Sequence, residues 1–157
     1  MPRRLGFCLL VAALCQPSIL SAETPYTPPQ IVQGEGGWES YIEPLMINPD
    51  TAQGLSPDPD TPEAAVVRFL ASRIRGDRAW QDVMVADPGR KTKKALKTWS
   101  RWTLNAAQIQ SRKMRGENRG YVRVWVDLTI DGDNETGSDD FTVKRETDGW
   151  RISEIPS

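Results

Sequence analysis

The chain has 157 residues, with 20 Lys and Arg against 21 Asp and Glu, which gives a formal net charge of −1. This length suits one modest domain together with a targeting segment. The sequence contains no histidine, so it excludes Ser-His-Asp and Cys-His catalysis and lacks the commonest zinc ligand.

Residues 1–22 have the layout of a cleaved secretory signal peptide. Arg3 and Arg4 precede an apolar stretch at residues 5–14, and small residues follow up to Ala22. The stretch is far shorter than the roughly 18 residues that a membrane span requires. We therefore expect cleavage near Ala22 and a secreted or periplasmic protein with no transmembrane span after cleavage.

Both cysteines, Cys8 and Cys15, lie inside this segment. The mature chain is therefore expected to carry no thiol, no disulfide and no thiolate metal site. A bacterial lipoprotein signal requires a small residue before the cysteine, whereas Leu14 precedes Cys15. Lipid anchoring at Cys15 is not expected.

Residues 23–60 form a Pro/Gly-rich acidic leader segment. Eight of the chain's 12 prolines fall in it or directly after it, which predicts neither a continuous helix nor a central strand there. Residues 38–47, WESYIEPLMI, are more apolar. Two interpretations stay open: this stretch docks Trp38, Tyr41 and Ile42 onto the domain, or the leader is a flexible tether.

Charge is distributed in blocks along the chain. Residues 23–67 hold eight acidic and no basic side chains, residues 68–120 have a local net charge of +10, and residues 121–157 have one of −5. Such blocks mark either a contact surface or a domain whose acidic and basic faces neutralise each other.

Three helices are predicted to follow the leader. In TPEAAVVRFLASRIRGD, Thr61 is the N-cap, apolar residues recur at helical spacing and Gly76 ends the helix. Asp77 caps a second helix, DRAWQDVMV. A third helix, RKTKKALKTWSRW, places Trp99 and Trp102 toward the protein.

After the helices the apolar period drops to two, which predicts about four antiparallel strands. Residues 107–114 form one strand and residues 121–131 a long one, whereas residues 132–139 are predicted to be a loop. The alternate residues of the long strand share one apolar face: Val122, Val124, Val126, Leu128 and Ile130.

Two further strands, FTVKRET and WRISEI, are joined by Asp-Gly at 148–149, the strongest short hairpin signal. A turn at this dipeptide pairs Thr147 with Trp150. Trp150 then closes one end of the core, which is a structural role. The same register places Arg145 and Glu154 on the Trp150 face of the hairpin.

The order of these elements is an α+β layout. PEAAVVRFLASRIRGD and DGWRISEI, at the two ends of residues 61–157, resemble motifs of the nuclear-transport-factor-2-like (cystatin-like) superfamily. The resemblance implies a cone-shaped domain, with three N-terminal helices packed on a curved antiparallel sheet of about four strands and a pocket at the open end. It also implies a possible homodimer. The superfamily holds enzymes and non-enzymes, so the fold does not decide the function.

The pocket is expected to hold a small apolar ligand or to be filled by its own rings. Its expected lining residues are Trp80, Trp99, Phe141, Arg145, Trp150 and Glu154. Glu154 and Asp127 are the catalytic candidates for acid–base chemistry. The alternatives are an ion pair between Glu154 and Arg145 at the pocket rim and a solvated Asp127. The histidine-dependent sites of the superfamily's enzymes have no counterpart in this chain.

No metal and no cofactor are expected. DGDNETGSDD at residues 131–140 has acidic residues at some spacings of a calcium loop, but Thr136 stands where such a loop needs glycine. A solvated loop is the better interpretation.

The third helix carries a basic stripe at helical spacing. Its members are Arg90, Lys94, Lys97 and Arg101, with Lys93 beside them. The stripe fits an anionic envelope component such as lipid headgroups or polysaccharide, or it is a solvated helix face. No aromatic ladder accompanies it, and no nucleic-acid partner is expected.

The leading hypothesis is an exported binding or accessory module with a small apolar pocket. The alternatives are an acid–base enzyme of the lyase or isomerase type that acts on a small apolar ligand, and an envelope-interaction protein that uses the basic helix face.

The signal peptide is testable by intact-mass measurement of the protein recovered from the export compartment of its host. We expect a chain that begins directly after Ala22, with no lipid mass. A chain that retains residues 1–22, or one that begins at a lipid-modified Cys15, contradicts the prediction.

Overall fold

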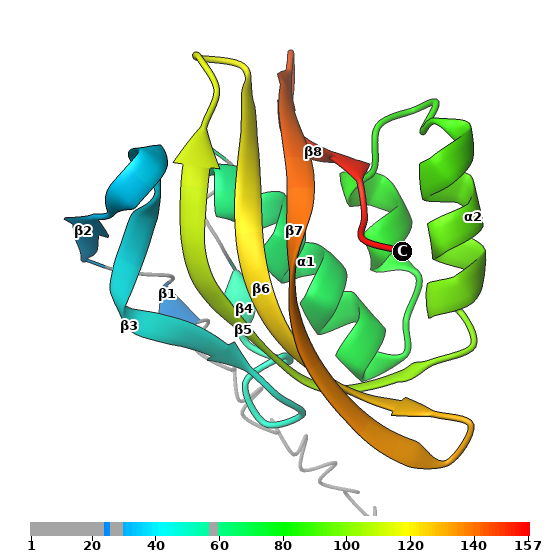
Figure 1. Cartoon of the computed structure of the whole chain (residues 1–157). Helices are drawn as coiled ribbons and strands as arrows, with labels where there is room; N and C mark the ends of the chain where they lie inside the picture. Colours follow the sequence, from blue (N-terminus) through cyan, green and yellow to red (C-terminus); the bar gives the residue numbers. More distant parts are fainter. Residues whose placement is uncertain (1–23, 26–29, 57–59) are drawn as a thin grey trace, which may run out of the picture.

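The computed structural model describes residues 24–25, 30–56 and 60–157 (Figure 1). The signal peptide predicted at residues 1–22 lies outside the described residues. The elements in chain order are β1 (Thr24–Pro25), β2 (Ile31–Gln33), η1 (Glu35–Gly37), β3 (Glu39–Ile47), β4 (Leu55–Ser56), α1 (Pro62–Arg75), η2 (Ala79–Val83), α2 (Arg90–Trp99), β5 (Thr103–Met114), β6 (Arg119–Ile130), β7 (Asp133–Glu146) and β8 (Gly149–Glu154), where η marks a 3₁₀ helix.

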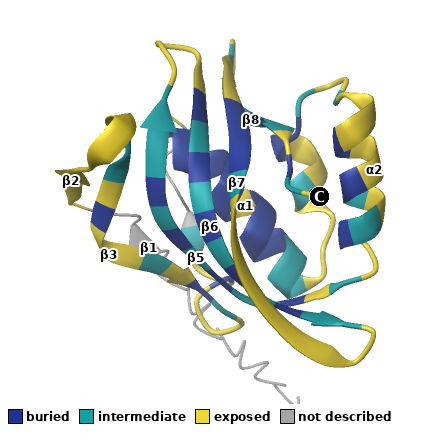
Figure 2. Cartoon of the chain, in the orientation of Figure 1, coloured by how far each residue is buried: buried dark blue, intermediate teal, exposed yellow. Residues whose placement is uncertain are grey.

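Six strands form one antiparallel sheet in the order β2-β3-β5-β6-β7-β8, and β1 and β4 form a separate parallel pair. α1 packs against β5 to β8 and α2 lies beside β8, while the long strands bend along their length (Figure 1). The core fills the space between α1 and the sheet (Figure 2).

The prediction of three N-terminal helices on about four strands is wrong. The described chain has two α-helices and a six-stranded sheet, and strands precede α1. The second predicted helix is a 3₁₀ helix of five residues, too short for an α-helix to propagate. The chain after this helix is extended, because Met84 forms a β-bridge with Ile152 and the Val85 N–H donates to the Ile152 carbonyl at 3.0 Å. The cone-shaped cystatin-like fold is therefore not confirmed.

The two additional strands, β2 and β3, come from the segment predicted to be a leader. β3 lies between β2 and β5, so the prediction of no central strand in this segment is wrong. Pro44 falls where the β3–β5 register shifts between Ser40 and Leu45, a bulge at which proline is tolerated. Of the residues expected to dock, Tyr41 is buried, whereas Ile42 stays exposed.

An ion-pair cluster with one buried carboxylate ties β3 to β5 and α1. Arg112 contacts Glu39 at 2.6 Å and Glu63 at 3.2 Å, and Glu63 is only 1% exposed. Burial acts to lower the pKa of Arg112, but the hydrogen bond to Glu39 and the charge of Glu63 raise that pKa above its ordinary value. The same hydrogen bond lowers the pKa of Glu39. A buried carboxylate such as Glu63 depends on this pairing, since an unpaired buried charge is strongly destabilising.

α1 begins and ends where the sequence predicts. Thr61 occupies the N-cap position and Pro62 is the first helical residue. Gly76 ends the helix in the left-handed conformation with φ 74°, which glycine adopts without steric cost.

Phe69 of α1 is the centre of an aromatic cluster. Its ring is fully buried and lies edge-on to Trp80, Trp99 and Phe141, with centroid distances of 6.0, 5.8 and 5.7 Å. These rings join α1, η2, α2 and β7 in one core. Edge-to-face pairs of this kind contribute about 0.5–1.5 kcal/mol each beyond their area burial.

The turn between β6 and β7 lies at Asp131 and Gly132, where a longer loop was predicted. Both residues have positive φ, 52° and 98°, as a two-residue hairpin turn matched to the strand twist requires. Ile130 then pairs with Asp133, and residues 133–140 continue as strand. The prediction of a loop over residues 132–139 is therefore wrong.

The turn of the last hairpin lies one residue earlier than predicted, so the strand pairing shifts by two residues. Its turn residues are Thr147 and Asp148, while Gly149, with φ 121°, opens β8. Trp150 pairs with Arg145 in place of Thr147. Only Gly149 of the dipeptide has a positive φ, whereas the predicted turn requires a positive φ at both residues.

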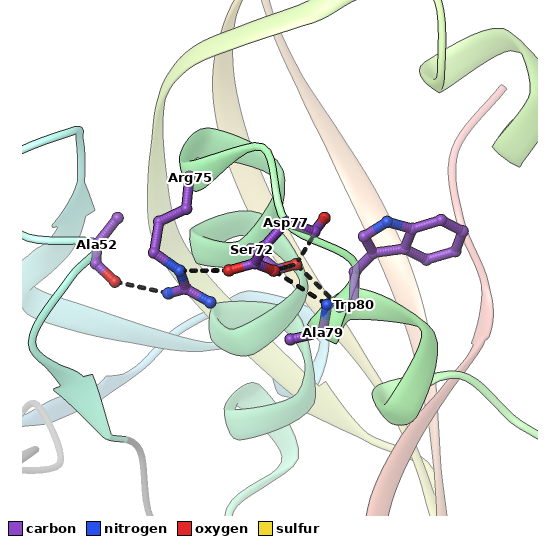
Figure 3. A network of polar contacts seen from close by, with 6 residues as sticks. All are labelled: Ala52, Ser72, Arg75, Asp77, Ala79 and Trp80. Carbon is purple, nitrogen blue, oxygen red and sulfur yellow. Dashed lines mark hydrogen bonds and ion pairs between the residues drawn. The ribbon is translucent and has the colours of Figure 1, made fainter.

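A polar network closes the end of α1 (Figure 3). The carboxylate of Asp77 accepts hydrogen bonds from the Ser72 hydroxyl, from Arg75 Nε at 2.7 Å and from the Ala79 N–H at 3.0 Å. The Ser72 hydroxyl in turn accepts the Trp80 N–H at 2.9 Å. The hydrogen bond from Ser72, followed by that from Arg75, lowers the pKa of Asp77 to about 2.

We predict that Phe69→Ala lowers the free energy of unfolding by about 3–5 kcal/mol, because it leaves a cavity among three rings. Urea unfolding measures the change. The exposed neighbour on α1 provides the control, and Arg68→Ala should shift the free energy by less than about 0.5 kcal/mol. Equal effects of the two substitutions would contradict a core organised around Phe69.

We predict that the stabilising effect of the Asp77 charge depends on pH. The pKa is about 2 in the folded chain against an ordinary 3.8, so the contribution is complete about one pH unit above 3.8 and is lost as the pH falls through 3.8 toward 2. The gap in free energy of unfolding between wild type and Asp77→Asn should therefore be constant from neutral pH down to about pH 5 and then close. Because the side chain is 42% exposed, the gap should be less than about 1 kcal/mol. A gap that is unchanged at pH 2 would contradict the assignment.

Candidate functional site

The inner face of β6 extends beyond the helix that covers it. α1 has 14 residues and is about 21 Å long, whereas the 12 residues of β6 span about 40 Å. Exposure rises along the strand: Val122 is 0% exposed, Val126 is 8% exposed and Ile130 is only partly buried. Toward the β6–β7 turn, this apolar face becomes the floor of a groove.

The groove has a volume of about 280 Å³. Val126, Leu128 and Ile130 form its floor, and the indole rings of Trp99 and Trp102 line it from the end of α2. We call it the apolar groove. Its remaining lining residues, from β7 and the C-terminal segment, are Glu135, Thr136, Gly137, Ser138, Asp139, Pro156 and Ser157.

Arg73 of α1 positions both tryptophans. Its Nη2 donates to the carbonyl of Trp99 at 2.7 Å and to that of Trp102 at 3.2 Å. The carbonyl of Trp99, the last residue of α2, has no partner within the helix, so a cation placed here satisfies it. Burial lowers the pKa of Arg73. The two rings are held 6.1 Å apart at a tilt of 44°.

The segment after β8 is fixed against α2 by the same tryptophan. Trp99 Nε1 donates to the carbonyl of Pro156 at 3.0 Å, and Ile155 is buried beside it. The chain therefore leaves β7 after Glu154 and approaches α2 (Figure 1). This path keeps the first half of β7 accessible from the groove.

Among the cavities lined by described residues, none is lined by all six residues that were predicted to form a pocket. Phe141 and Trp99 pack against Phe69 in the core, and Trp80 packs on the same ring. Of the six, only Trp99 lines the apolar groove.

Trp150 and Arg145 line a separate cavity of about 470 Å³ together with Arg112. The indole N–H of Trp150 donates to the carbonyl of Asp60 at 3.1 Å, just before α1. Trp150 is 7% exposed and belongs to the core cluster, in keeping with its predicted structural role.

Glu154 lies on the outer face of the sheet, away from Trp150. Ser153 is an extra residue in β8, and such a bulge moves the following side chain to the opposite face. Glu154 pairs with Thr142, whose hydroxyl donates to it at 3.4 Å, and contacts Arg119 at 3.5 Å. The predicted ion pair with Arg145 is not formed.

Asp127 also lies on the outer face of the sheet. Its neighbours along β6, Val126 and Leu128, point to the inner face and form part of the groove floor. Asn105 Nδ2 donates to its carboxylate at 3.1 Å and to the Thr129 hydroxyl at 3.0 Å. Neither catalytic candidate therefore contacts the apolar groove.

The basic stripe is exposed along α2, on the side away from the buried Ala95 and Trp99. Lys93 contacts Asp87 at 2.8 Å, and it is the one member with an ion-pair partner among the residues that the structure describes. The members are Arg90, Lys93, Lys94, Lys97 and Arg101, all exposed.

Sequence reasoning missed the β7 side of the groove. The sequence predicts the alternation of β6 as far as Ile130. It also predicts a loop for residues 133–139, so these residues are not expected beside the apolar face of β6. The signal was present in the second Asp-Gly dipeptide, at 131–132, which is as strong a turn signal as the one at 148–149.

In the described ranges no helix is long and apolar enough to cross a membrane, and no three His, Cys, Asp or Glu side chains gather as a metal site would require. Comparison with protein-family models, with curated proteins and with solved structures finds no match to this chain. The resemblance to the nuclear-transport-factor-2-like superfamily therefore stays a prediction.

Proposed function

We propose that the protein is exported and acts as a binding module whose apolar groove holds an apolar group of its ligand. One observation carries this proposal: the alternating apolar face of β6 continues past the helices and remains partly open beside two tryptophans. At about 280 Å³ the groove is near the lower end of ligand pockets, which are about 300–1,000 Å³.

The lining supports binding of an apolar group with a polar or cationic neighbour. The floor and the two indole rings are apolar, whereas the polar lining residues include the carboxylates of Glu135 and Asp139 and no lysine or arginine. The groove therefore disfavours an anionic ligand. Its tryptophans are held by Arg73 and by the core, so they are preorganised.

The acid–base alternative receives no support from the positions of its candidates. Glu154 and Asp127 lie on the outer face of the sheet, and the apolar groove lies on the inner face. A general base must lie within hydrogen-bond reach of the proton that it removes. The envelope alternative requires only the basic stripe, a surface separate from the groove.

We predict that phenylnaphthylamine, a neutral apolar fluorescent probe, binds the groove and becomes brighter there. Trp102→Ala and Ile130→Asn should each weaken its binding about tenfold, because they remove an apolar wall and part of the apolar floor. Fluorescence titration gives the Kd. Cooperative unfolding of each variant shows that it is folded.

Trp38→Ala is the matched control. Trp38 lies under Arg123 of the outer face, 4.1 Å from the guanidinium carbon to the ring centroid, so its removal should leave the Kd unchanged. No probe binding to the wild type, or equal loss in Trp38→Ala and Trp102→Ala, would contradict the proposed function.

A further inference from the structure

The first half of β7 is an unpaired sheet edge. β7 has 14 residues and β8 has six, and β8 pairs with β7 only between Thr142 and Glu146. Within the described chain, residues 133–141 pair with β6 on one side and with no strand on the other. Figure 2 shows this part of β7 as a continuous exposed arm. A free edge of this length is a template for pairing with another chain.

The backbone groups that face outward can be assigned. The carbonyl of Thr142 accepts the Ser153 hydroxyl at 3.3 Å, so it faces the β8 side, whereas the Arg145 N–H donates at 2.9 Å to Asn118, which directly precedes β6. In an antiparallel strand alternate residues face the same neighbour. The outward residues of the free edge are therefore Asn134, Thr136, Ser138 and Asp140.

Of these outward N–H groups, only that of Asp140 has an acceptor among the described residues. The Asp139 carboxylate accepts it at 2.8 Å. The N–H groups of Thr136 and Ser138 are left for an added strand. Both residues also line the apolar groove, so the edge and the groove form one continuous surface.

The side chains along this edge define the charge of the partner. Asp133, Glu135 and Asp139 are exposed and have no ion-pair partner among the described residues, whereas Asp140 pairs with Arg123 at 2.8 Å. Residues 131–143 contain no lysine or arginine. A second copy of the same edge would bring like charges opposite each other, which is destabilising. Charge complementarity therefore points to a basic partner.

On the inner face, the free edge of β7 presents two acidic side chains with a glycine between them. Glu135, Gly137 and Asp139 alternate along β7, and Gly137 pairs with Val126 on the groove floor. A Cβ at Gly137 would contact nothing within 4 Å, so there is open space at this position. An apolar side chain opposite Gly137 can reach across it to the floor, while basic side chains on either side face Glu135 and Asp139.

We propose that the β7 edge from Asn134 to Asp140 binds an extended basic segment of a partner protein as an added strand, with the pattern basic–polar–apolar–polar–basic. The apolar side chain occupies the groove, so the inference rests on the proposed function. The outward N–H and C=O groups of Thr136 and Ser138 supply the backbone hydrogen bonds. The polar residues of the segment lie on the outer face.

The test uses fluorescent peptides with the core Lys-Thr-Leu-Thr-Lys and the full mature chain. Hydrogen exchange should slow at the N–H groups of Thr136 and Ser138 when this peptide is added. The matched peptide Glu-Thr-Leu-Thr-Glu, and one with N-methylated threonines, should bind at least about tenfold more weakly, because the first reverses the charge and the second cannot form the ladder.

Protein variants supply the matched comparison. Glu135→Lys should weaken the binding of the lysine peptide about three- to tenfold, since attraction becomes repulsion across the strand pair; fluorescence anisotropy gives the Kd. Glu43→Lys makes the same change of charge at an exposed position of β3 and should leave the affinity unchanged. Equal effects of the two substitutions would overturn the proposal, because they would indicate only long-range attraction.

The outcomes separate the two proposals. If phenylnaphthylamine binds in a Trp102-dependent way but the lysine peptide protects no N–H of β7, the strand-addition proposal fails and the binding module stands. If neither binds, the proposed function itself fails. If the acidic peptide binds as well as the basic one, the proposed partner chemistry is wrong.

Discussion

The lengths of β6 and β7 are the constraint on which the other features depend. The 12 and 14 residues of these strands span about 40 and 46 Å, whereas α1 spans about 21 Å and the six residues of β8 about 20 Å. The short elements cannot cover the long ones. One mismatch leaves an open apolar face on β6, and the other leaves an open edge on β7. The apolar groove is where the two meet.

The contacts that close the core also shape this groove. Phe69 contacts rings from three other elements, and Trp99 belongs both to that cluster and to the groove wall. Arg73 donates to the carbonyls of Trp99 and Trp102 and so holds the backbone of both tryptophans. Trp99 also donates to the carbonyl of Pro156, which holds the C-terminal segment against α2 at the side of the groove. Each of these contacts contributes to the fold, and together they keep the groove from being filled.

The two faces of the sheet have different chemistry. The inner face is apolar along β6 and acidic at the β7 edge, whereas the outer face carries charged pairs such as Arg123 with Asp140 and the stacked Arg123–Trp38 contact. The bulge in β8 adds Glu154 to the outer face. A single extra residue thus separates the acidic candidate from the groove, and what remains on the inner face is suited to binding.

The sequence alone determined the features that depend on neighbouring residues: α1 with its N-cap and its terminal Gly76, the alternation of β6, and the basic stripe of α2. It could not determine how the strands pair, because two Asp-Gly dipeptides carry the same local turn signal and only tertiary pairing distinguishes them. The same holds for the segment around Pro44, which looks unfit for a sheet until a bulge accommodates it, and for Glu154, whose face depends on the register of β8. Local patterns follow from short-range sterics, whereas register and coverage follow from which elements meet in space. The tertiary structure therefore decided where the groove and the free edge lie.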